Sequence, residues 1–127
     1  MSFKNALVVD DDNKFRALLR RILEKKLHMI VSEAENGLKG LEAFKKTAFH
    51  LIFLDIAMPI MNGIELLEKI REENKTVPII VMTCMCDKDS VEKILQLGVS
   101  DYLLKTEFVT NLATRIEEIV AKSIGVN

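Results

Sequence analysis

The chain has 127 residues, 49 % of them hydrophobic, which suffices for one domain whose buried core needs no disulfide or metal to hold it together. Its 18 basic and 19 acidic side chains nearly cancel, so the sequence offers no broad basic surface for nucleic acid or for an anionic membrane. We therefore expect a single domain over residues 1–127, with its core at about 4–123, that binds no nucleic acid directly.

The sequence also argues against a secreted or membrane-bound protein. No apolar run approaches the ~20 residues that cross a bilayer, and a strand pattern starts too soon after Met1 to leave room for a signal peptide. Cys84 and Cys86 lie too close along the chain to bridge comfortably, which fits a reducing compartment. We expect a soluble cytoplasmic protein with no membrane partner.

Short apolar runs alternate with amphipathic segments along the whole chain. In chain order, strands are predicted at Ala6–Val9, Met29–Val31, Leu51–Leu54, Val77–Thr83 and Val99–Leu104. The intervening segments have the spacing of helix faces, marked by Phe15, Leu18 and Ile22, by Leu38, Leu41 and Phe44, by Ile64, Leu67 and Ile70, by Val91, Ile94 and Leu95, and by Leu112, Ile116 and Ile119. Five such units predict an α/β fold, a parallel sheet with helices on both faces.

One carboxylate stands where open α/β sheets present their chemistry. Leu51–Leu54 is apolar at every position, which is typical of a strand covered on both faces, and Asp55 follows at its carboxyl end. Pro59 and the pair Asn62–Gly63 then break regular structure before the next helix. Taken alone, Asp55 could also be a turn or capping residue.

The sequence from Asp55 to Gly63 reads Asp-x-x-Met-Pro-x-Met-x-Gly, which resembles the phospho-acceptor signature of response-regulator receiver domains. The resemblance spans nearly the whole chain. It implies a doubly wound, flavodoxin-like (βα)5 domain whose five strands are ordered 2-1-3-4-5, an order that the apolar pattern alone leaves open. In that order the first and third strands are neighbours, so Asp10–Asp12 would lie beside Asp55.

Several carboxylates gathered in one crevice repel each other, and a hard divalent cation such as Mg²⁺ relieves that repulsion. The resemblance implies that the ligands are Asp10, Asp11, one oxygen of Asp55 and the backbone carbonyl of Ala57, with Asp11 the more direct of the acidic pair. Asp12, directly after the pair, is left outside this set. The simpler interpretation of these acids is an N-cap cluster in which Asp12 or Asn13 satisfies the free amides of the following helix, and it explains one acid well but three poorly.

Receivers take a phosphoryl group from a phosphohistidine, and the resemblance assigns that acceptor role to Asp55. Lys105 and Thr83 would then contact the phosphoryl oxygens, and Thr83 would form a switch with Tyr102. Each of these three residues also has a simpler interpretation. Thr83 could be an ordinary threonine at a strand end, Lys105 a solvated surface lysine, and Tyr102 a strand residue whose hydroxyl contacts water.

Two positions depart from the receiver pattern. Thr106 follows Lys105, where receivers usually have a proline in a cis peptide, and a cis bond before a non-proline residue costs about 3 kcal/mol. Cys84 follows the switch threonine, where a small residue is common, so we expect restricted access to the phosphoryl group. Ala57 has no polar side chain to position a water molecule, so we expect the phosphoryl group on Asp55 to be hydrolysed slowly.

The resemblance implies partners as well as chemistry. The phosphodonor would be a sensor histidine kinase or a histidine phosphotransfer protein, and a downstream protein would bind the face of the fourth helix, fifth strand and fifth helix. Such a protein assists its own phosphorylation and dephosphorylation but is not an enzyme. Two alternatives remain open: a haloacid-dehalogenase-like phosphatase that uses Asp10, and a phosphate-independent pseudo-receiver that serves as an interaction module.

Overall fold

The computed structural model describes residues 4–58, 60–83, 88–105 and 109–124. The elements in chain order are β1 (Asn5–Val9), α1 (Asn13–Leu27), β2 (Ile30–Ala34), α2 (Gly37–Lys46), β3 (Leu51–Asp55), α3 (Gly63–Glu73), β4 (Ile79–Thr83), α4 (Lys88–Gln96), β5 (Asp101–Leu104) and α5 (Val109–Ile124). Within the described residues the strands form one parallel sheet in the order β2-β1-β3-β4-β5. The predicted fold class and strand order are confirmed.

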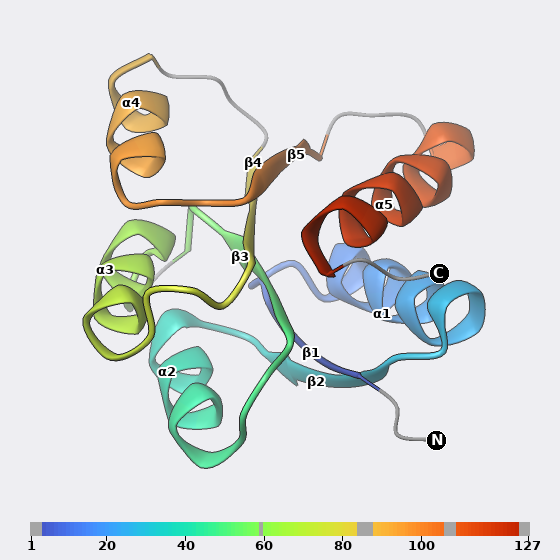
Figure 1. The fold of residues 1–127 in the computed structure, drawn as a ribbon, viewed down its shortest axis with the longest axis horizontal. Coiled ribbons are helices and arrows are strands. Elements are labelled where there is room, and N and C mark those ends of the chain that lie inside the picture. Colours follow the sequence, from blue (N-terminus) through green and yellow to red (C-terminus); the bar gives the residue numbers. More distant parts are fainter. Residues whose placement is uncertain (1–3, 59, 84–87, 106–108, 125–127) are drawn as a thin grey trace.

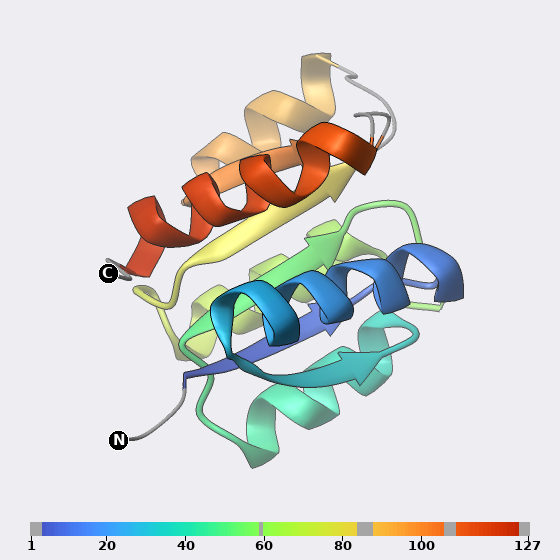
Figure 2. The same ribbon diagram turned by 90° about the vertical axis from the view of Figure 1, so that its right-hand side faces the viewer.

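Helices cover both faces of the sheet. Figure 1 shows α1 and α5 on one side and α2, α3 and α4 on the other. Figure 2, which looks at the first of these sides, shows α1 and α5 side by side in front of the strands. Because successive strand residues point to opposite faces, Ala6 and Val8 pack under α1 and α5, whereas Leu7 and Val9 pack under the other three helices.

Local side chains fix where the helices begin and end. The oxygen of Asp12 accepts hydrogen bonds from the first amides of α1, and Asn36 and Asn62 cap α2 and α3 in the same way. After α4, Gly98 has a φ of 77°, the left-handed conformation that glycine adopts without strain and that often ends a helix. These caps set the starting points of α1 and α3, the helices that follow the two acidic strand ends.

Three strands have a bound that differs from the prediction by two residues or more. The second strand continues to Ala34, because its residues past Val31 pair with β1 although Ser32 and Glu33 are polar. The fourth strand begins at Ile79 rather than Val77, since Pro78 has no amide to donate to a ladder. The fifth strand begins at Asp101 rather than at Val99.

Two side chains expected to pack inward are exposed. Leu38 lies in the first turn of α2 and is 47 % exposed. Leu95 of α4 is 61 % exposed, while its neighbour Ile94 is buried and supplies the contact with the core. The predicted helices are present, but the apolar stripe of α4 is wider than the surface that it covers.

Within the described residues, no helix has both the length and the apolar character needed to cross a bilayer.

A glycine lets the third helix start directly against the acidic strand end. At Gly63 a Cβ atom would lie 2.1 Å from the backbone oxygen of Asp55 and 2.6 Å from the Cα of Ile56. The Gly63 amide also donates a 2.8 Å hydrogen bond to the Ile56 carbonyl. Only glycine permits this approach without moving the backbone. Close packing therefore explains why the Asp55–Gly63 signature ends in glycine.

Candidate functional site

The polar residues singled out in the sequence lie where parallel strands end. The strands of Figure 2 point toward one edge of the sheet, and their carboxyl ends meet there. β1 and β3 are neighbours with Val9 opposite Leu54, so the next residues, Asp10 and Asp55, emerge side by side. The strand order thus brings together two acids that are far apart in the sequence.

Asp10, Asp11 and Asp55 form an acidic cluster at this edge. One carboxylate oxygen of each lies within 4.8 Å of the others. Asp10 is fully buried and Asp55 is 4 % exposed, whereas Asp11 is exposed to solvent. The carboxylate of Asp12 points instead to its own helix, where it accepts hydrogen bonds from Lys14 and Phe15 amides at 3.0 and 3.2 Å. Of the two capping candidates in the sequence, Asp12 and Asn13, the structure has Asp12 as the cap.

Lys105 joins the two buried carboxylates. Its Nζ lies 3.1 Å from Asp10 Oδ1, 2.9 Å from Asp10 Oδ2 and 3.4 Å from Asp55 Oδ2. Only 8 % of the lysine side chain is exposed. Burial by itself lowers the pKa of Lys105, but the adjacent Asp10 and Asp55 outweigh it and raise that pKa, which keeps the ammonium charged. Lys105 reaches the acidic cluster, although the Lys105–Thr106 bond lies outside the described residues.

The pKa of Asp55 is raised to about 7. Removal from water is the main cause, and the neighbouring charge of Asp10 adds to it. Lys105 and the Ala57 amide, which donates to Asp55 Oδ1 at 3.2 Å, act in the opposite direction and lower it. The pKa of Asp55 stays raised although Lys105 lies beside it. The positive charge of one lysine is therefore too small to offset the burial of Asp55 and the charge of Asp10.

The donor set of the cluster fits a hard divalent cation. Asp10 Oδ2 is buried and, although it lies close to the ammonium of Lys105, it accepts no hydrogen bond of good geometry from the described residues. An exposed carboxylate, that of Asp11, completes a group of oxygen donors on the solvent side. Carboxylate oxygens with room for water are the ligands that Mg²⁺ prefers, and a cation there would supply the missing charge.

Thr83 and Tyr102 come from the two adjoining strands. Thr83 ends β4 and is partly buried; its carbonyl accepts a 2.9 Å hydrogen bond from the Lys105 amide, which links it to the same strand ends. Tyr102 of β5 is 49 % exposed, so its ring lies at the surface. Cys84, whose bulk was expected to narrow the entrance, lies outside the described residues.

Sequence reasoning missed Arg16, which supports the acidic cluster from α1. Its Nη1 donates to the backbone oxygen of Asp10 at 2.6 Å, and its Nε lies 2.8 Å from Glu33 of β2. Arg16 thereby ties α1, β1 and β2 together directly behind the cluster. In the sequence it is one of several arginines on the polar face of α1, and nothing local distinguishes it.

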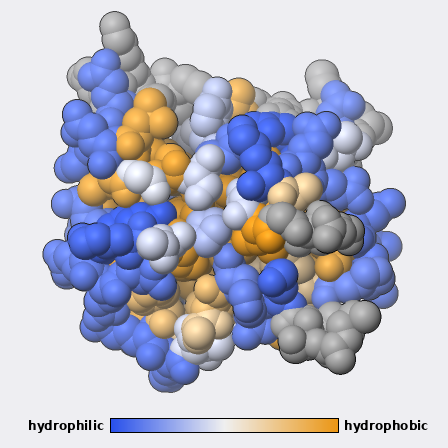
Figure 3. Space-filling model, in the orientation of Figure 1, coloured by the Kyte–Doolittle hydropathy of each residue, from blue (hydrophilic) through white to orange (hydrophobic). Residues whose placement is uncertain are grey.

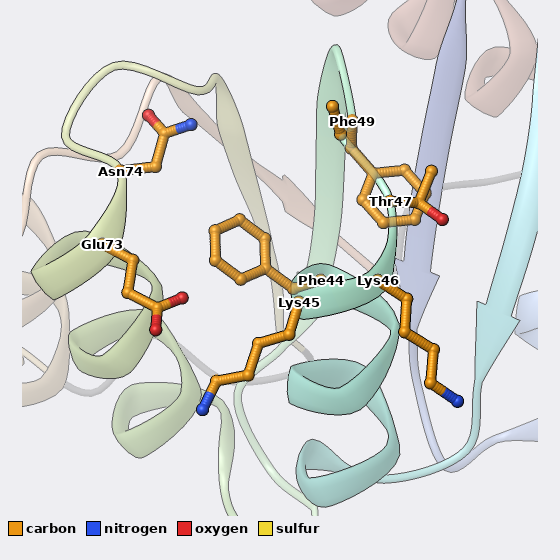
Figure 4. Close-up of a pocket in the computed structure, with 8 residues that line it drawn as sticks. Phe44, Lys45, Lys46, Thr47, Phe49, Glu73 and Asn74 are labelled. Carbon is orange, nitrogen blue, oxygen red and sulfur yellow. The ribbon is translucent and has the colours of Figure 1, made fainter.

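A separate hollow lies on the α2 and α3 side of the molecule. It has a volume of about 450 Å³, and Figure 4 shows the Phe44 ring between the side chains of Glu73 and Phe49. Its lining comes from the carboxyl ends of α2 and α3 and the segment before β3. The parallel strands begin near there, so this hollow is remote from the acidic cluster, and the chemistry of the chain lies elsewhere.

Comparison with known proteins identifies the family of this chain. The family model of the response regulator receiver domain matches residues 6–117. The chain belongs to this family. It is therefore a receiver of two-component signalling, and receivers of this kind take up a phosphoryl group rather than turn over a substrate.

Known receivers resemble this one over most of its length. The chemotaxis protein CheY of Halobacterium salinarum is 37 % identical over 102 residues, which make up 80 % of this chain and 84 % of that protein. The CheY of Bacillus subtilis is 34 % identical over 119 residues, 94 % of this chain and 96 % of that protein. The transcriptional regulatory protein ResD of Bacillus subtilis is 36 % identical over 121 residues, but the receiver spans only 48 % of its length.

Solved structures show the same fold. A CheY-like receiver domain protein from Methanospirillum hungatei superposes with a TM-score of 0.83 at 29 % identity, covering 95 % of this chain and 97 % of that one. The receiver domain of sensor histidine kinase PA1611 from Pseudomonas aeruginosa superposes with a TM-score of 0.84 at 25 % identity, covering 98 % and 99 %. The PA1611 structure has a magnesium ion coordinated in its active site cleft.

The raised pKa of Asp55 predicts a pH-dependent stability in the absence of divalent cations. The carboxyl has a pKa of 3.8 when unperturbed and about 7 in the folded protein, so the folded state binds the extra proton. Its stabilising contribution is complete below pH ~4 and is lost as the pH rises through ~7. Between these limits the free energy of unfolding of the wild type should fall, relative to Asp55→Asn, by on the order of 4 kcal/mol.

Urea unfolding in a chelating buffer at several pH values measures this difference. Asp12→Asn is a suitable control, because asparagine keeps the helix cap while one carboxylate outside the cluster is removed. Parallel pH profiles for the wild type and Asp55→Asn would contradict the raised pKa.

Proposed function

We propose that Asp55 is the residue of this receiver that accepts the phosphoryl group. It stands at the end of β3, is almost fully buried, and is the carboxylate around which the other polar strand ends are arranged. An Asp55 oxygen attacks the phosphorus of a phosphohistidine, the N–P bond breaks, and its electron pair remains on the imidazole nitrogen. The product is an aspartyl phosphate. The grouping of Asp55 with Asp10, Asp11 and Lys105 is the observation that carries this proposal.

The groups that would hold Mg²⁺ are the carboxylates of Asp10, Asp11 and Asp55 together with the backbone carbonyl of Ala57. The spacing of the three carboxylates and the poorly bonded Oδ2 of Asp10 support this assignment. A bound Mg²⁺ supplies positive charge that stabilises the oxygens of the phosphoryl group in transfer. Asp12 is excluded because its side chain caps α1.

Lys105 and Thr83 supply the remaining contacts to the phosphoryl group. The ammonium of Lys105 already lies against Asp55 Oδ2, so a small rotation brings it to an oxygen of the attached phosphoryl group. Thr83 ends the adjacent strand and offers a hydroxyl to another oxygen. Both residues raise the receiver's ability to assist its own phosphorylation and later dephosphorylation.

The signal leaves the molecule through the face of α4, β5 and α5. Phosphorylation adds negative charge that draws the Thr83 hydroxyl inward, and the Tyr102 ring follows into the space released. Two exposed residues, Leu95 and Tyr102, mark this face as a surface that a protein partner would cover. Figure 3 shows hydrophobic side chains reaching the surface beside α4, in the upper left of the view.

We further assign the whole of residues 1–127 to one receiver domain with its core at about 4–123, working in the cytoplasm. The phosphodonor is a sensor histidine kinase or a histidine phosphotransfer protein, and the output goes to a downstream protein. Family membership supports both partner classes at this coarse level. A phosphatase that uses Asp10 as nucleophile is disfavoured, because the family model that matches residues 6–117 is that of a receiver domain.

Mass analysis after incubation with acetyl phosphate and Mg²⁺ tests the proposed function. The wild type should gain the mass of one phosphoryl group on the peptide that contains Asp55, and Asp55→Asn should gain none. Turnover of acetyl phosphate through Asp10, without retained label, would support the phosphatase. A wild type that neither retains nor turns over phosphate would make the chain a phosphate-independent pseudo-receiver.

The movement proposed for Tyr102 can be followed by fluorescence, because the chain has one tyrosine and no tryptophan. In the unphosphorylated protein the half-exposed ring should be quenched efficiently by acrylamide. After phosphorylation the quenching constant should fall, since the ring is withdrawn from solvent. In a Thr83→Ala variant that mass analysis shows to be phosphorylated, the constant should stay unchanged. An equal fall in both proteins would separate Tyr102 from Thr83 and refute the coupled switch.

A further inference from the structure

An aromatic ring of α1 covers the buried lysine of the cluster. The Nζ of Lys105 lies 4.8 Å from the centroid of the Phe15 ring, within the range of a cation–π interaction. Phe15 is partly buried and packs on the core beneath α1 and α5. Its amide donates to the Asp12 carboxylate at 3.2 Å, so the cap of α1 also fixes the backbone that carries the ring. The ring is thus held in place by contacts that do not involve Lys105.

The carboxylates that hold Lys105 are the same ones that would bind the metal. The ammonium approaches Asp10 Oδ2 at 2.9 Å and Asp55 Oδ2 at 3.4 Å, and both acids belong to the proposed ligand set. Two cations cannot each keep their full share of these oxygens. Once a divalent ion is present, Lys105 loses part of its attraction to the cluster, and a long side chain freed in this way gains rotamer entropy by moving to solvent.

The Phe15 ring is the contact that a metal ion does not compete for. Its interaction with the ammonium depends on the electron density of the ring face and is the same whether or not the carboxylates are neutralised. In a site shielded from water such an interaction is worth more than at an exposed surface. The ring and the metal therefore bind different partners, and Lys105 can remain near Asp55 while the phosphodonor enters.

We propose that Phe15 is a positioning residue that keeps Lys105 directed toward the acidic cluster when a divalent cation occupies it. This inference rests on the proposed function, in which Lys105 contacts the phosphoryl group on Asp55. It also gives a reason why Lys105 reaches the cluster in a chain that has Thr106 in place of the usual proline. An aliphatic side chain in place of Phe15 would fill the same space but would not attract the ammonium.

Two substitutions separate attraction to the ring from packing. Phe15→Leu keeps an apolar side chain on the core but removes the ring, and Phe15→Tyr keeps the ring. The matched control is Phe44→Leu, the same change at a partly buried phenylalanine of α2 that lines the remote hollow. With acetyl phosphate and saturating Mg²⁺, Phe15→Leu should be phosphorylated roughly three- to thirtyfold more slowly than the wild type. Phe15→Tyr and Phe44→Leu should react at nearly the wild-type rate.

Carbon-13 NMR of labelled lysine provides a readout that needs no phosphorylation. The ring face should shift the ε-CH₂ proton resonance of Lys105, assigned with Lys105→Arg, upfield in the wild type. That shift should persist when Mg²⁺ is added and should disappear in Phe15→Leu. It should remain in Phe15→Tyr, where an aromatic face is still present.

The outcomes distinguish this inference from the proposed function. Equal phosphorylation rates for the wild type and Phe15→Leu would overturn the inference and leave the acceptor role of Asp55 intact. Equal slowing in Phe15→Leu and Phe15→Tyr, without an upfield Lys105 resonance in the wild type, would reduce Phe15 to a packing residue and also overturn it. A wild type that accepts no phosphoryl group refutes the proposed function and the role of Phe15 with it.

Discussion

The structure depends on one electrostatic constraint, the grouping of like charges at the end of the sheet. Asp10 and Asp55 are buried side by side because β1 and β3 are neighbours, and Asp11 adds a third carboxylate within 4.8 Å. Lys105 offsets part of this charge, yet the pKa of Asp55 is still raised to about 7. Such an arrangement costs stability in the isolated protein. Further positive charge would offset this cost, and the proposed Mg²⁺ is a cation that the three carboxylates could hold.

The surrounding structure holds this unfavourable arrangement in place. Gly63 lets α3 begin against the backbone of Asp55, and the Asp12 cap sets the start of α1. From α1, Arg16 bonds the backbone of Asp10. Each contact involves backbone or a helix terminus rather than the acidic oxygens themselves. The cluster can therefore exchange ligands without losing its supports, which suits a site that alternates between two chemical states.

The fold and most residues of the candidate site could be predicted from the sequence. Parallel strands that alternate with helices all end at one edge of the sheet, and the polar residues that follow the strands could therefore be placed at that edge. Other features depend on tertiary contacts without a local signal. Leu95 is 61 % exposed although its neighbour Ile94 is buried, and the amphipathic pattern does not distinguish the two. The contacts of Arg16 and Phe15 join α1 to residues brought close only by folding. Neither differs in sequence from an ordinary helix residue.

The most direct test of the account is the Mg²⁺ affinity of the cluster, measured by titration calorimetry at neutral pH without a phosphodonor. Asp11 is exposed, so Asp11→Asn removes one proposed ligand charge with little effect on folding. The adjacent Asp12→Asn removes an equal charge but preserves the helix cap. Asp11→Asn should weaken Mg²⁺ binding by roughly tenfold or more, whereas Asp12→Asn should change it little. Equal affinities in all three proteins, or no binding by the wild type, would contradict this prediction.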